Sequence, residues 1–466
     1  MNIRKRYTKV CLFLWVIGMC LCAHPINAQS VIPVPLKMEQ GTGSFLLSEK
    51  TKLYTNLQGE EAILLGDYLK TALPVQFKEG KKKDKQNVLS LLITEKNPQL
   101  VSPESYILSV TPEHILIQAS SGAGLFYGIQ TLLQLSQPSG TGYSIVSVEV
   151  QDTPRFAYRG MMLDVSRHFF SKEFVKKQID ALAFYKLNRL HLHLTDDPAW
   201  RLEVKKYPAL TDRAFHWKSR LPGKFYTQEQ LKDLTDYCAR LNIQVIPEID
   251  MPGHSQPFAK AMKTGMQTEK GVSILKDVVD ETVALFPGRF FHMGSDEVHI
   301  TMKDFIPRMA EYIRGKGKEV IVWSPGGPHD KDSVLMCWGE SEAGARMDKG
   351  MKRIDSNGFY IDWADSQSGV YQVFFQQPCE VPQGDEKALG AIMPVWCDGN
   401  LSSEKRVLEQ YPLYPCVLTF AERVWRGSAT KRKDYMAQLP PRGTAGWAEF
   451  LSLIHISEPT RLALIS

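Results

Sequence analysis

The chain has 466 residues, of which 43% are hydrophobic and 23% are charged, and it contains no low-complexity tract. This composition is typical of a globular protein and excludes a disordered or fibrous one, and the length suits a barrel of about 250 residues plus a smaller domain. The formal net charge is +5, and because the main basic run (78–85, KEGKKKDK) is interrupted by acids and glycine, no nucleic-acid partner is expected.

Residues 1–28 have the pattern of a secretory signal peptide. Four basic residues within the first nine precede an apolar run at 10–23, and Ala28-Gln29 is a suitable cleavage point. The apolar run is too short to span a bilayer as a helix. We therefore expect an exported, periplasmic protein that has no membrane span after cleavage, and whose charge falls from +5 to +1 with the loss of those four residues. The alternative is a lipid anchor at Cys20 or Cys22 that attaches the chain to the outer membrane.

Residues 29–150 are expected to form a small α+β domain, because short strand-like runs are followed by an apolar stretch with helical spacing. The predicted strands are 44–47, 88–93, 106–110 and 114–119, and the predicted helix is 123–135. None of these segments carries a recognisable catalytic pattern.

Residues 151–450 alternate between apolar strand-like runs and amphipathic helical stretches, which predicts parallel βα units that close into a (β/α)8 barrel. The predicted strands are 160–165, 189–195, 244–249, 290–294, 319–323, 334–337, 359–361 and 390–396. The predicted helices are 172–186, 231–241, 274–286 and 309–316, and a last helical pattern begins at 403–410.

Residues 451–466 (LSLIHISEPTRLALIS) resemble a translated sequencing adaptor more than a protein segment. We exclude them from the predicted fold. On this interpretation the natural chain continues differently beyond residue 450.

Every predicted barrel strand ends in acidic or aromatic side chains, and function in such barrels sits at the carboxyl ends of the strands. A single aspartate after a strand is usually a helix cap, and we expect a cap or structural role for Asp197. The whole set favours a carbohydrate site, because carboxylates and arginine bind hydroxyls and tryptophans offer flat apolar faces to sugar rings. Carboxylates also supply the acid–base chemistry of glycosidic bonds.

Four segments in register resemble family 20 glycoside hydrolases, the β-N-acetylhexosaminidases: RGMMLDVSRHFF (159–170), HLHLTDD (191–197), PEIDMPGHS (247–255) and HMGSDE (292–297). The resemblance covers about residues 32–450 and implies a small α+β domain followed by a (β/α)8 barrel. It also implies an exo-acting enzyme that removes terminal β-linked N-acetylhexosamine from glycans, with retention of configuration and without a metal or other cofactor.

The resemblance makes Glu297 the general acid/base and Asp296 the residue that orients the substrate's acetamido group, whose oxygen acts as the nucleophile. We expect neighbouring carboxylates and partial burial to favour the protonated form of Glu297. The other positions that match the family's substrate-binding pattern are Arg167, Asp196, Asp250, His254, Trp323, Trp338, Tyr360, Asp362, Trp396 and Asp398.

Within that set the implied roles differ. Tyr360 would bind the acetamido oxygen, Asp362 a ring hydroxyl and Arg167 the outer hydroxyls, while the three tryptophans would form the walls of the acetamido pocket. Asp250, His254 and Asp196 would form a polar network behind the acid/base residue. Asp398 replaces the glutamate that is usual in the family.

Three alternatives remain at the level of the sequence. His191 and His193 share one face of a strand and could bind zinc with Asp196 in a metal-dependent hydrolase. A non-catalytic carbohydrate-binding barrel and an endo-acting relative that releases a disaccharide are the others. The five cysteines after the signal peptide are odd in number and scattered, so their spacing indicates no zinc site, and the sequence leaves their disulfide pairing open. The sequence leaves the oligomeric state open.

Overall fold

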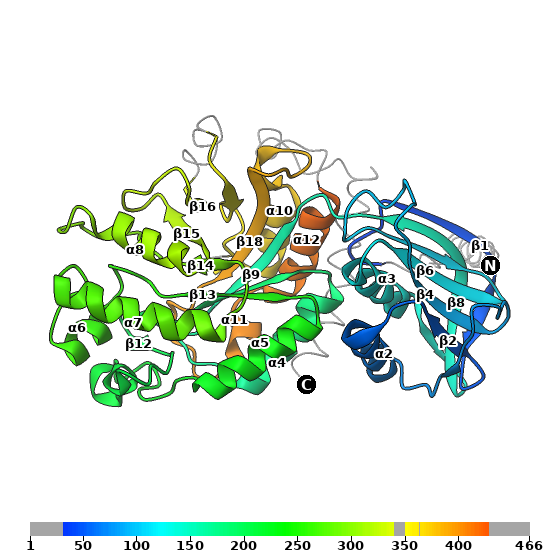
Figure 1. Ribbon diagram of the computed structural model, residues 1–466, viewed down its shortest axis with the longest axis horizontal. Coiled ribbons are helices and arrows are strands. Elements are labelled where there is room, and N and C mark those ends of the chain that lie inside the picture. Colours follow the sequence, from blue (N-terminus) through cyan, green and yellow to red (C-terminus); the bar gives the residue numbers. More distant parts are fainter. Residues whose placement is uncertain (1–30, 340–349, 363, 428–466) are drawn as a thin grey trace, which may run out of the picture.

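The structure is a computed structural model that describes residues 31–339, 350–362 and 364–427. It contains two domains, a barrel and a smaller sheet domain, which lie side by side along the long axis of the molecule (Figure 1). The predicted signal peptide and the adaptor-like tail lie outside the described residues. Among the described helices, none is both long and apolar enough to cross a bilayer.

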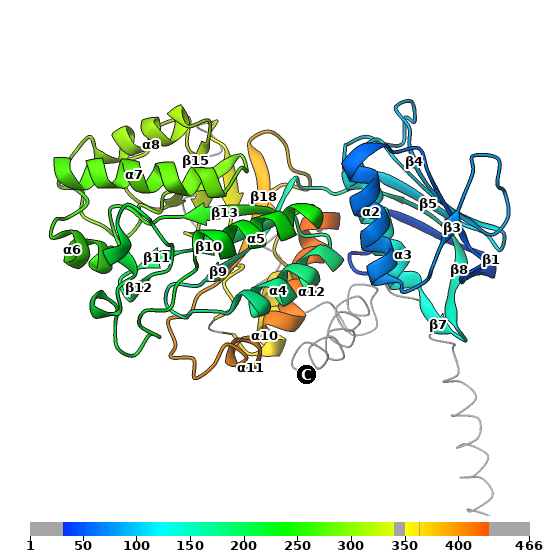
Figure 2. The same cartoon turned by 60° about the horizontal axis from the view of Figure 1, so that its bottom comes forward.

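The N-terminal domain is built on a mostly antiparallel sheet whose two helices lie on the side that faces the barrel (Figure 2). The sheet order is β1 (Lys37–Leu47), β8 (Gly142–Asp152), β5 (Tyr106–Val110), β6 (His114–Ala119), β4 (Val88–Ile93), β2 (Lys52–Thr55) and β3 (Lys78–Glu79), and β7 (Gln137–Ser139) pairs with β8. The helices are α2 (Gly59–Ala72) and α3 (Gly122–Leu135). Helix α3 packs closely on the sheet because it has glycine at 124 and 128, where an added Cβ would lie 2.4 Å from Ser105 O and 2.5 Å from Ile117 Cγ2.

The second domain is a closed barrel of eight parallel strands, which confirms the predicted fold class. In order around the barrel they are β9 (Tyr158–Asp164), β10 (Arg189–His193), β13 (Gln244–Glu248), β14 (Phe290–His292), β15 (Glu319–Ser324), β16 (Val334–Cys337), β17 (Arg353–Asp355) and β18 (Ala388–Val395). A short hairpin of β11 (Thr195–Asp196) and β12 (Ala199–Trp200) follows β10.

The connecting helices surround the barrel, and several begin at a side chain that accepts a backbone hydrogen bond. Ser171 caps α4 (Lys172–Phe184), and Thr227 forms a capping box with Gln230 in α5 (Gln228–Arg240). The remaining α-helices are α6 (Gln256–Met262), α7 (Glu269–Leu285), α8 (Phe305–Gly315), α10 (Ser366–Phe374), α11 (Arg406–Gln410) and α12 (Leu413–Arg426). Short 3-10 turns lie at η1 (Pro208–Thr211), η2 (Arg213–Phe215) and η3 (Pro378–Glu380).

The prediction of a strand at 359–361 is wrong, because the seventh barrel strand is β17. Phe359 and Ile361 are fully buried, but they lie in the loop after β17. Phe359 packs against Phe420 of α12, with ring centroids 5.1 Å apart. Their apolar character therefore comes from packing on a helix and not from a place in the barrel sheet.

Two buried charged contacts join the domains. Lys186, which follows α4, donates from Nζ to Tyr106 Oη at 2.8 Å and to Asp152 Oδ2 at 3.1 Å in the N-terminal sheet. Arg159 of β9 donates to both carboxylate oxygens of Glu104 at 2.9 Å. Arg159 and Lys186 are both fully buried, so each depends on its partner in the other domain for the stability of its charge.

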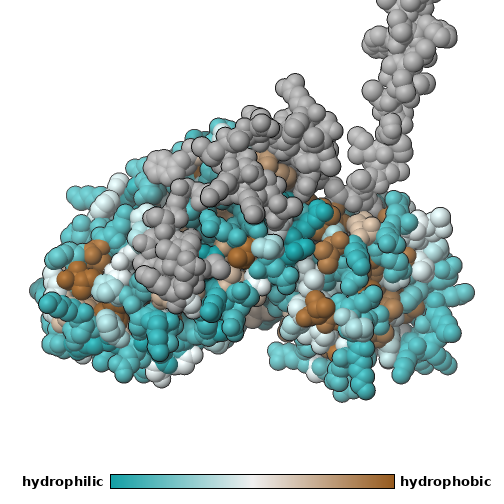
Figure 3. Space-filling view, turned by 90° about the horizontal axis from the view of Figure 1, so that it is seen from above, coloured by the Kyte–Doolittle hydropathy of each residue, from teal (hydrophilic) through white to brown (hydrophobic). Residues whose placement is uncertain are grey.

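The surface is mostly polar. On the face shown in Figure 3, hydrophilic residues predominate and the apolar patches are small and separate. The large apolar side chains that are exposed in the described chain are Leu36, Leu46, Ile63, Val101, Trp217 and Leu221.

Candidate functional site

Asp296 and Glu297 lie in a tight turn that directly follows β14, at the carboxyl end of the barrel. The turn needs glycine at position 294, where φ is +68° and an added Cβ would lie 1.8 Å from Asp250 Oδ1. The same Asp250 oxygen accepts a hydrogen bond from the backbone N–H of Ser295 at 3.2 Å. Asp250 is thus packed beneath the turn, which places the pair at the barrel mouth.

The Asp296 side chain is held in a polar but largely buried environment. Burial and the negative charge of Glu248 raise the pKa of Asp296 to about 6. Burial, with the nearby Asp296 and Glu248 charges, also raises the pKa of Asp250 well above its usual range. Among the described residues, Asp296 Oδ1 is buried without a hydrogen-bond partner, which is unusual for a buried polar atom.

Glu297 lies on the solvent side of the same turn. Its side chain is 63% exposed, so the partial burial expected from the sequence is not observed. His254 Nε2 lies 3.7 Å from Glu297 Oε2, and His254 Nδ1 lies 3.3 Å from Asp196 Oδ1. The hydrogen bond with Asp196 is the main cause that raises the pKa of His254 to about 9, so a protonated imidazole connects the two carboxylates near neutral pH.

Glu248 is a fully buried carboxylate of β13 that the sequence analysis did not select as a site residue. It contacts His191 Nε2 at 2.9 Å, His193 Nδ1 at 2.6 Å and His292 Nδ1 at 3.2 Å, and it accepts from Trp323 Nε1 at 2.8 Å. Burial alone would raise the pKa of Glu248, but the surrounding histidines lower it well below its usual range. Glu248 thus anchors Trp323 and the histidines as an anion. Its position two residues before Asp250, at the end of a predicted barrel strand, could have identified it as a site residue.

Arg167 contacts three carboxylates and one aromatic ring, and it shares Asp196 with His254. Its guanidinium contacts Asp164 Oδ2 at 3.1 Å, Asp196 Oδ2 at 2.8 Å and Asp398 Oδ1 at 3.1 Å. The guanidinium carbon lies 5.0 Å from the centroid of the Trp396 ring, within cation–π range. Asp164, which was not predicted as a site residue, is fully buried and holds the arginine from behind.

The predicted aromatic residues cluster above the barrel core. Trp323 and Trp396 have ring centroids 5.7 Å apart, and Trp338 packs against the same group while its Nε1 donates to Pro325 O at 3.0 Å. Tyr360 is largely buried, and burial raises the pKa of its hydroxyl group, which also interacts with the Trp396 side chain. Burial likewise raises the pKa of Asp362 to about 6. The site therefore offers apolar faces and polar atoms together.

A cavity of about 320 Å³ is lined by two of the predicted hydroxyl-binding carboxylates, Asp362 and Asp398. Gly399, Gln410 and Tyr411 complete its lining, and the sequence analysis identified none of these three. Tyr411 follows α11, far from any barrel strand, so only the fold brings it to the site.

The zinc site considered from the sequence is not assembled by the residues proposed for it. His191 and His193 both contact Glu248, and the second ring nitrogen of His193 contacts Asp196 Oδ2 at 2.9 Å. Because both nitrogens of His193 are engaged by carboxylates, the three residues do not converge on one point. The predicted structural role of Asp197 is confirmed, because its Oδ1 accepts from the first backbone N–H of α6, that of Gln256, at 3.1 Å.

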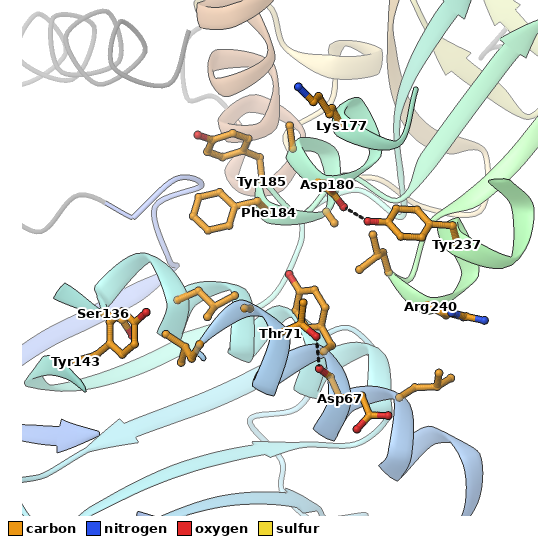
Figure 4. A pocket seen from close by; sticks show the side chains of 18 residues that line it. Asp67, Thr71, Ser136, Tyr143, Lys177, Asp180, Phe184, Tyr185, Tyr237 and Arg240 are labelled. Atoms are coloured by element: carbon orange, nitrogen blue, oxygen red, sulfur yellow. Dashed lines mark hydrogen bonds between the residues drawn. The ribbon is translucent and has the colours of Figure 1, made fainter. Parts of the chain in front are cut away.

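A cavity of about 1090 Å³ lies between the two domains (Figure 4). Helix α2 forms one wall, and α4 and α5 form the other. Two of its polar groups are already paired: Tyr237 donates to Asp180 Oδ1 at 2.5 Å, and Thr71 donates to the Asp67 carbonyl at 2.8 Å. None of the predicted site residues lines it.

Family models match both domains. The model described as "Glycosyl hydrolase family 20, catalytic domain" matches residues 156–272 and 260–428, and that described as "Glycosyl hydrolase family 20, domain 2" matches residues 28–153. Among curated relatives, a β-hexosaminidase of Porphyromonas gingivalis is 31% identical over 86% of this chain. A β-N-acetylhexosaminidase of Cellulomonas fimi is 33% identical over 66% of this chain and 69% of its own length.

The chain spans only 61% of the length of the Porphyromonas relative. Solved structures agree with the fold. A family 20 exo-β-N-acetylglucosaminidase from Vibrio harveyi, in complex with N-acetylglucosamine, superposes with a TM-score of 0.78 at 25% identity, covering 94% of this chain and 78% of that one. A β-N-acetylhexosaminidase from Bacteroides fragilis has a TM-score of 0.77 at 25% identity, covering 93% and 96% respectively.

Proposed function

Because the chain belongs to glycosyl hydrolase family 20, we propose that it is an exo-acting β-N-acetylhexosaminidase that removes terminal β-linked N-acetylglucosamine or N-acetylgalactosamine from glycans. The observation that carries the proposal is the turn after β14. It places a buried carboxylate, Asp296, next to an exposed one, Glu297, among aromatic and hydroxyl-binding side chains.

In the proposed reaction the substrate's own acetamido oxygen attacks the anomeric carbon while the glycosidic C–O bond breaks. Glu297 gives its proton to the departing oxygen, and Asp296 accepts a hydrogen bond from the acetamido N–H and stabilises the positive charge of the oxazolinium ion. Water then attacks the anomeric carbon from the face the aglycone left, while the bond from that carbon to the acetamido oxygen breaks and the acetamido group is restored. Glu297 takes a proton from the water, so the configuration is retained.

The different surroundings of the two carboxylates support this division of roles. Asp296 is largely buried, which suits a place beside an acetamido group that is enclosed by the pocket. Glu297 is accessible to solvent and therefore to a leaving group and to water. The chain needs no nucleophilic side chain, because the substrate supplies the nucleophile.

Glu297→Gln tests the proposal directly. We expect hydrolysis of p-nitrophenyl N-acetyl-β-glucosaminide and galactosaminide to fall by at least ~10²-fold, the usual contribution of a general acid/base. The matched control is Glu311→Gln on the exposed face of α8, which should leave the rate unchanged. Equal rates for wild type and Glu297→Gln, or equally fast cleavage of an analogue without the 2-acetamido group, would sink the proposal.

We also propose that the enzyme is exported to the periplasm and acts there on glycans. The basic and apolar pattern of residues 1–28 supports export. Fractionation of cells that express the full chain should place hexosaminidase activity in the periplasmic extract; activity confined to the cytosol would contradict export, and activity in the outer membrane would favour the lipid anchor.

A further inference from the structure

The long loop between β12 and α5 contacts the residues that follow β18; in the barrel, only β9 lies between β18 and β10. At its tip, Arg220 donates from Nη1 to Cys397 O at 2.8 Å and Gly399 O at 3.2 Å, and from Nη2 to Asp398 O at 2.5 Å. A weaker contact of 3.5 Å reaches Arg167 O. One guanidinium thus binds the backbone of three consecutive residues that follow the last barrel strand.

The loop that presents Arg220 is itself held in place from behind. Arg201 is fully buried and donates to the carbonyls of Ser166, Arg220, Leu221 and Lys224 at 2.6–3.1 Å. Burial lowers the pKa of Arg201 to about 10, so it remains charged at neutral pH. The backbone around Arg220 is therefore held by hydrogen bonds from a buried guanidinium.

The segment that Arg220 binds carries a predicted sugar ligand. Asp398 contacts Arg167 Nε at 3.1 Å through Oδ1, although its side chain is 55% exposed. From below, Asp164 Oδ2 accepts from the backbone N–H of Cys397 at 3.1 Å. Arg220 above and Asp164 below together fix the backbone at 397–399. Without Arg220, the Asp164 contact and the ion pair with Arg167 would be left to orient Asp398.

We propose that Arg220 is a positioning residue for recognition of the terminal sugar, because it fixes the backbone that presents Asp398 to the sugar's outer hydroxyls beside Arg167. This inference rests on the proposed function. Arg220 does not touch the bond that breaks, so its loss weakens sugar binding more than it slows the chemical step. Only a guanidinium spans the three carbonyls, so the charge of a lysine is not sufficient.

The test compares Arg220→Ala, Arg220→Lys, Asp398→Ala and the double variant Arg220→Ala/Asp398→Ala with p-nitrophenyl N-acetyl-β-glucosaminide. We expect Arg220→Ala to raise KM roughly tenfold with kcat within about threefold of wild type, the signature of lost binding that is common to ground and transition states. Arg220→Lys should recover only part of the loss. The matched control is Lys218→Ala, an exposed cation of the same loop, which should leave KM unchanged.

The double variant separates positioning from independent effects. If Arg220 acts through Asp398, the double variant has a KM within about twofold of that of Asp398→Ala alone. If the two penalties multiply, or if Arg220→Ala leaves KM unchanged, the inference is wrong. Thermal melting of each variant shows whether it is folded. The proposal is also wrong if Arg220→Ala melts at the same temperature as wild type and has a lower kcat with an unchanged KM.

A binding measurement keeps this inference apart from the proposed function. Titration of wild type and Arg220→Ala with N-acetylglucosamine, followed by tryptophan fluorescence, should show a roughly tenfold higher Kd in the variant. An inactive wild type that still binds the sugar in this way would refute the proposed hydrolysis but support the role of Arg220. Equal Kd values would refute that role, whether or not the wild type is an active enzyme.

Discussion

Asp296 and Glu297 are neighbours in the sequence, but the turn after β14 places the Asp296 side chain in a buried environment and the Glu297 side chain in solvent. Asp296 faces other acidic groups in a buried pocket, where ionisation is costly, whereas Glu297 faces solvent and a histidine. Two carboxylates in such different surroundings can carry separate duties, which is a recurrent feature of glycosidases. The division follows from backbone geometry, since both residues at positions 295 and 297 have positive φ.

The pKa of Asp296, about 6, leads to a prediction on pH dependence. Below this pH the carboxylate becomes protonated and loses the negative charge that stabilises the oxazolinium ion, so kcat/KM should fall as the pH is lowered through about 6. Because Glu248 contributes to raising this pKa, Glu248→Gln removes a negative charge and should move the acid limb to lower pH.

The measurement is the pH profile of kcat/KM for both proteins between pH 4 and 8, a range set by the usual stability of proteins. Glu248→Gln also replaces the anion that binds the three histidines with a neutral amide, so its absolute rate can fall; the readout is the pH at the midpoint of the fall in kcat/KM. An acid limb that stays in place, or that moves to higher pH, contradicts the assignment of this limb to Asp296.

The residues of the site were largely recognisable from local sequence, but their connections were not. Acidic and aromatic residues after barrel strands indicated the pocket, and the His-x-His pattern of β10 placed two imidazoles on one face. That both imidazoles pair with Glu248 depends on the register of β10 against β13, where His193 lies opposite Glu248. Register is a property of the folded barrel, so the His-x-His pattern of the sequence was also compatible with a zinc site.

At the scale of elements, the turn after β14 is the most demanding segment of the barrel. Gly294→Ala should lower kcat/KM by ~10²-fold, because the new Cβ would lie 1.8 Å from Asp250 Oδ1 and displace Asp296 by a fraction of an ångström or more. The matched control is Gly317→Ala after α8, where φ is also positive, at +79°, but nothing lies within 4 Å of the added Cβ.

Steady-state kinetics of the two glycine variants separates the clash from backbone strain. Both variants carry an alanine with positive φ, which costs roughly 1–2 kcal/mol of stability. Only Gly294→Ala should lose activity. If both variants lose activity equally, strain alone explains the loss, and the close packing of Asp250 beneath the turn is not required for catalysis.

The elements most easily predicted were those whose local pattern of apolar residues matches the way they pack in the folded protein. Strands β4, β5, β6 and β16 match the predicted ranges, since each is a short apolar run between turn residues. The seventh barrel strand was missed because β17 has only three residues (Arg353–Asp355) and two of them are charged, whereas the apolar run at 359–361 packs on α12. Long-range packing, which a single segment does not encode, decided between the two.

At the scale of the whole molecule, the two domains are joined by buried charges. Lys186→Met would leave Asp152 without its cationic partner in a fully buried site, and removal of one member of such a pair costs about 3–5 kcal/mol. We expect this loss in the free energy of unfolding measured with denaturant. The matched control is Lys232→Met, which removes an exposed lysine paired with Asp236 in α5 and should have little effect.

Lys186→Met/Asp152→Asn tests whether the cost arises from an unpaired charge. The double variant should be more stable than the sum of the two single losses predicts, because neither residue is left charged without its partner. Additive losses would indicate that the two residues contribute separately, for example through their contacts with Tyr106 and Trp425.

The buried contacts between the domains have a consequence for protein engineering. A barrel expressed without residues 31–152 would expose Lys186 and Arg159 to solvent at a face shaped for Asp152 and Glu104. A chimaera that grafts this barrel onto a homologue's sheet domain must therefore bring both acidic partners with it. The linker near residue 153 is a convenient place to cut the gene, but such a cut separates Lys186 and Arg159 from their acidic partners.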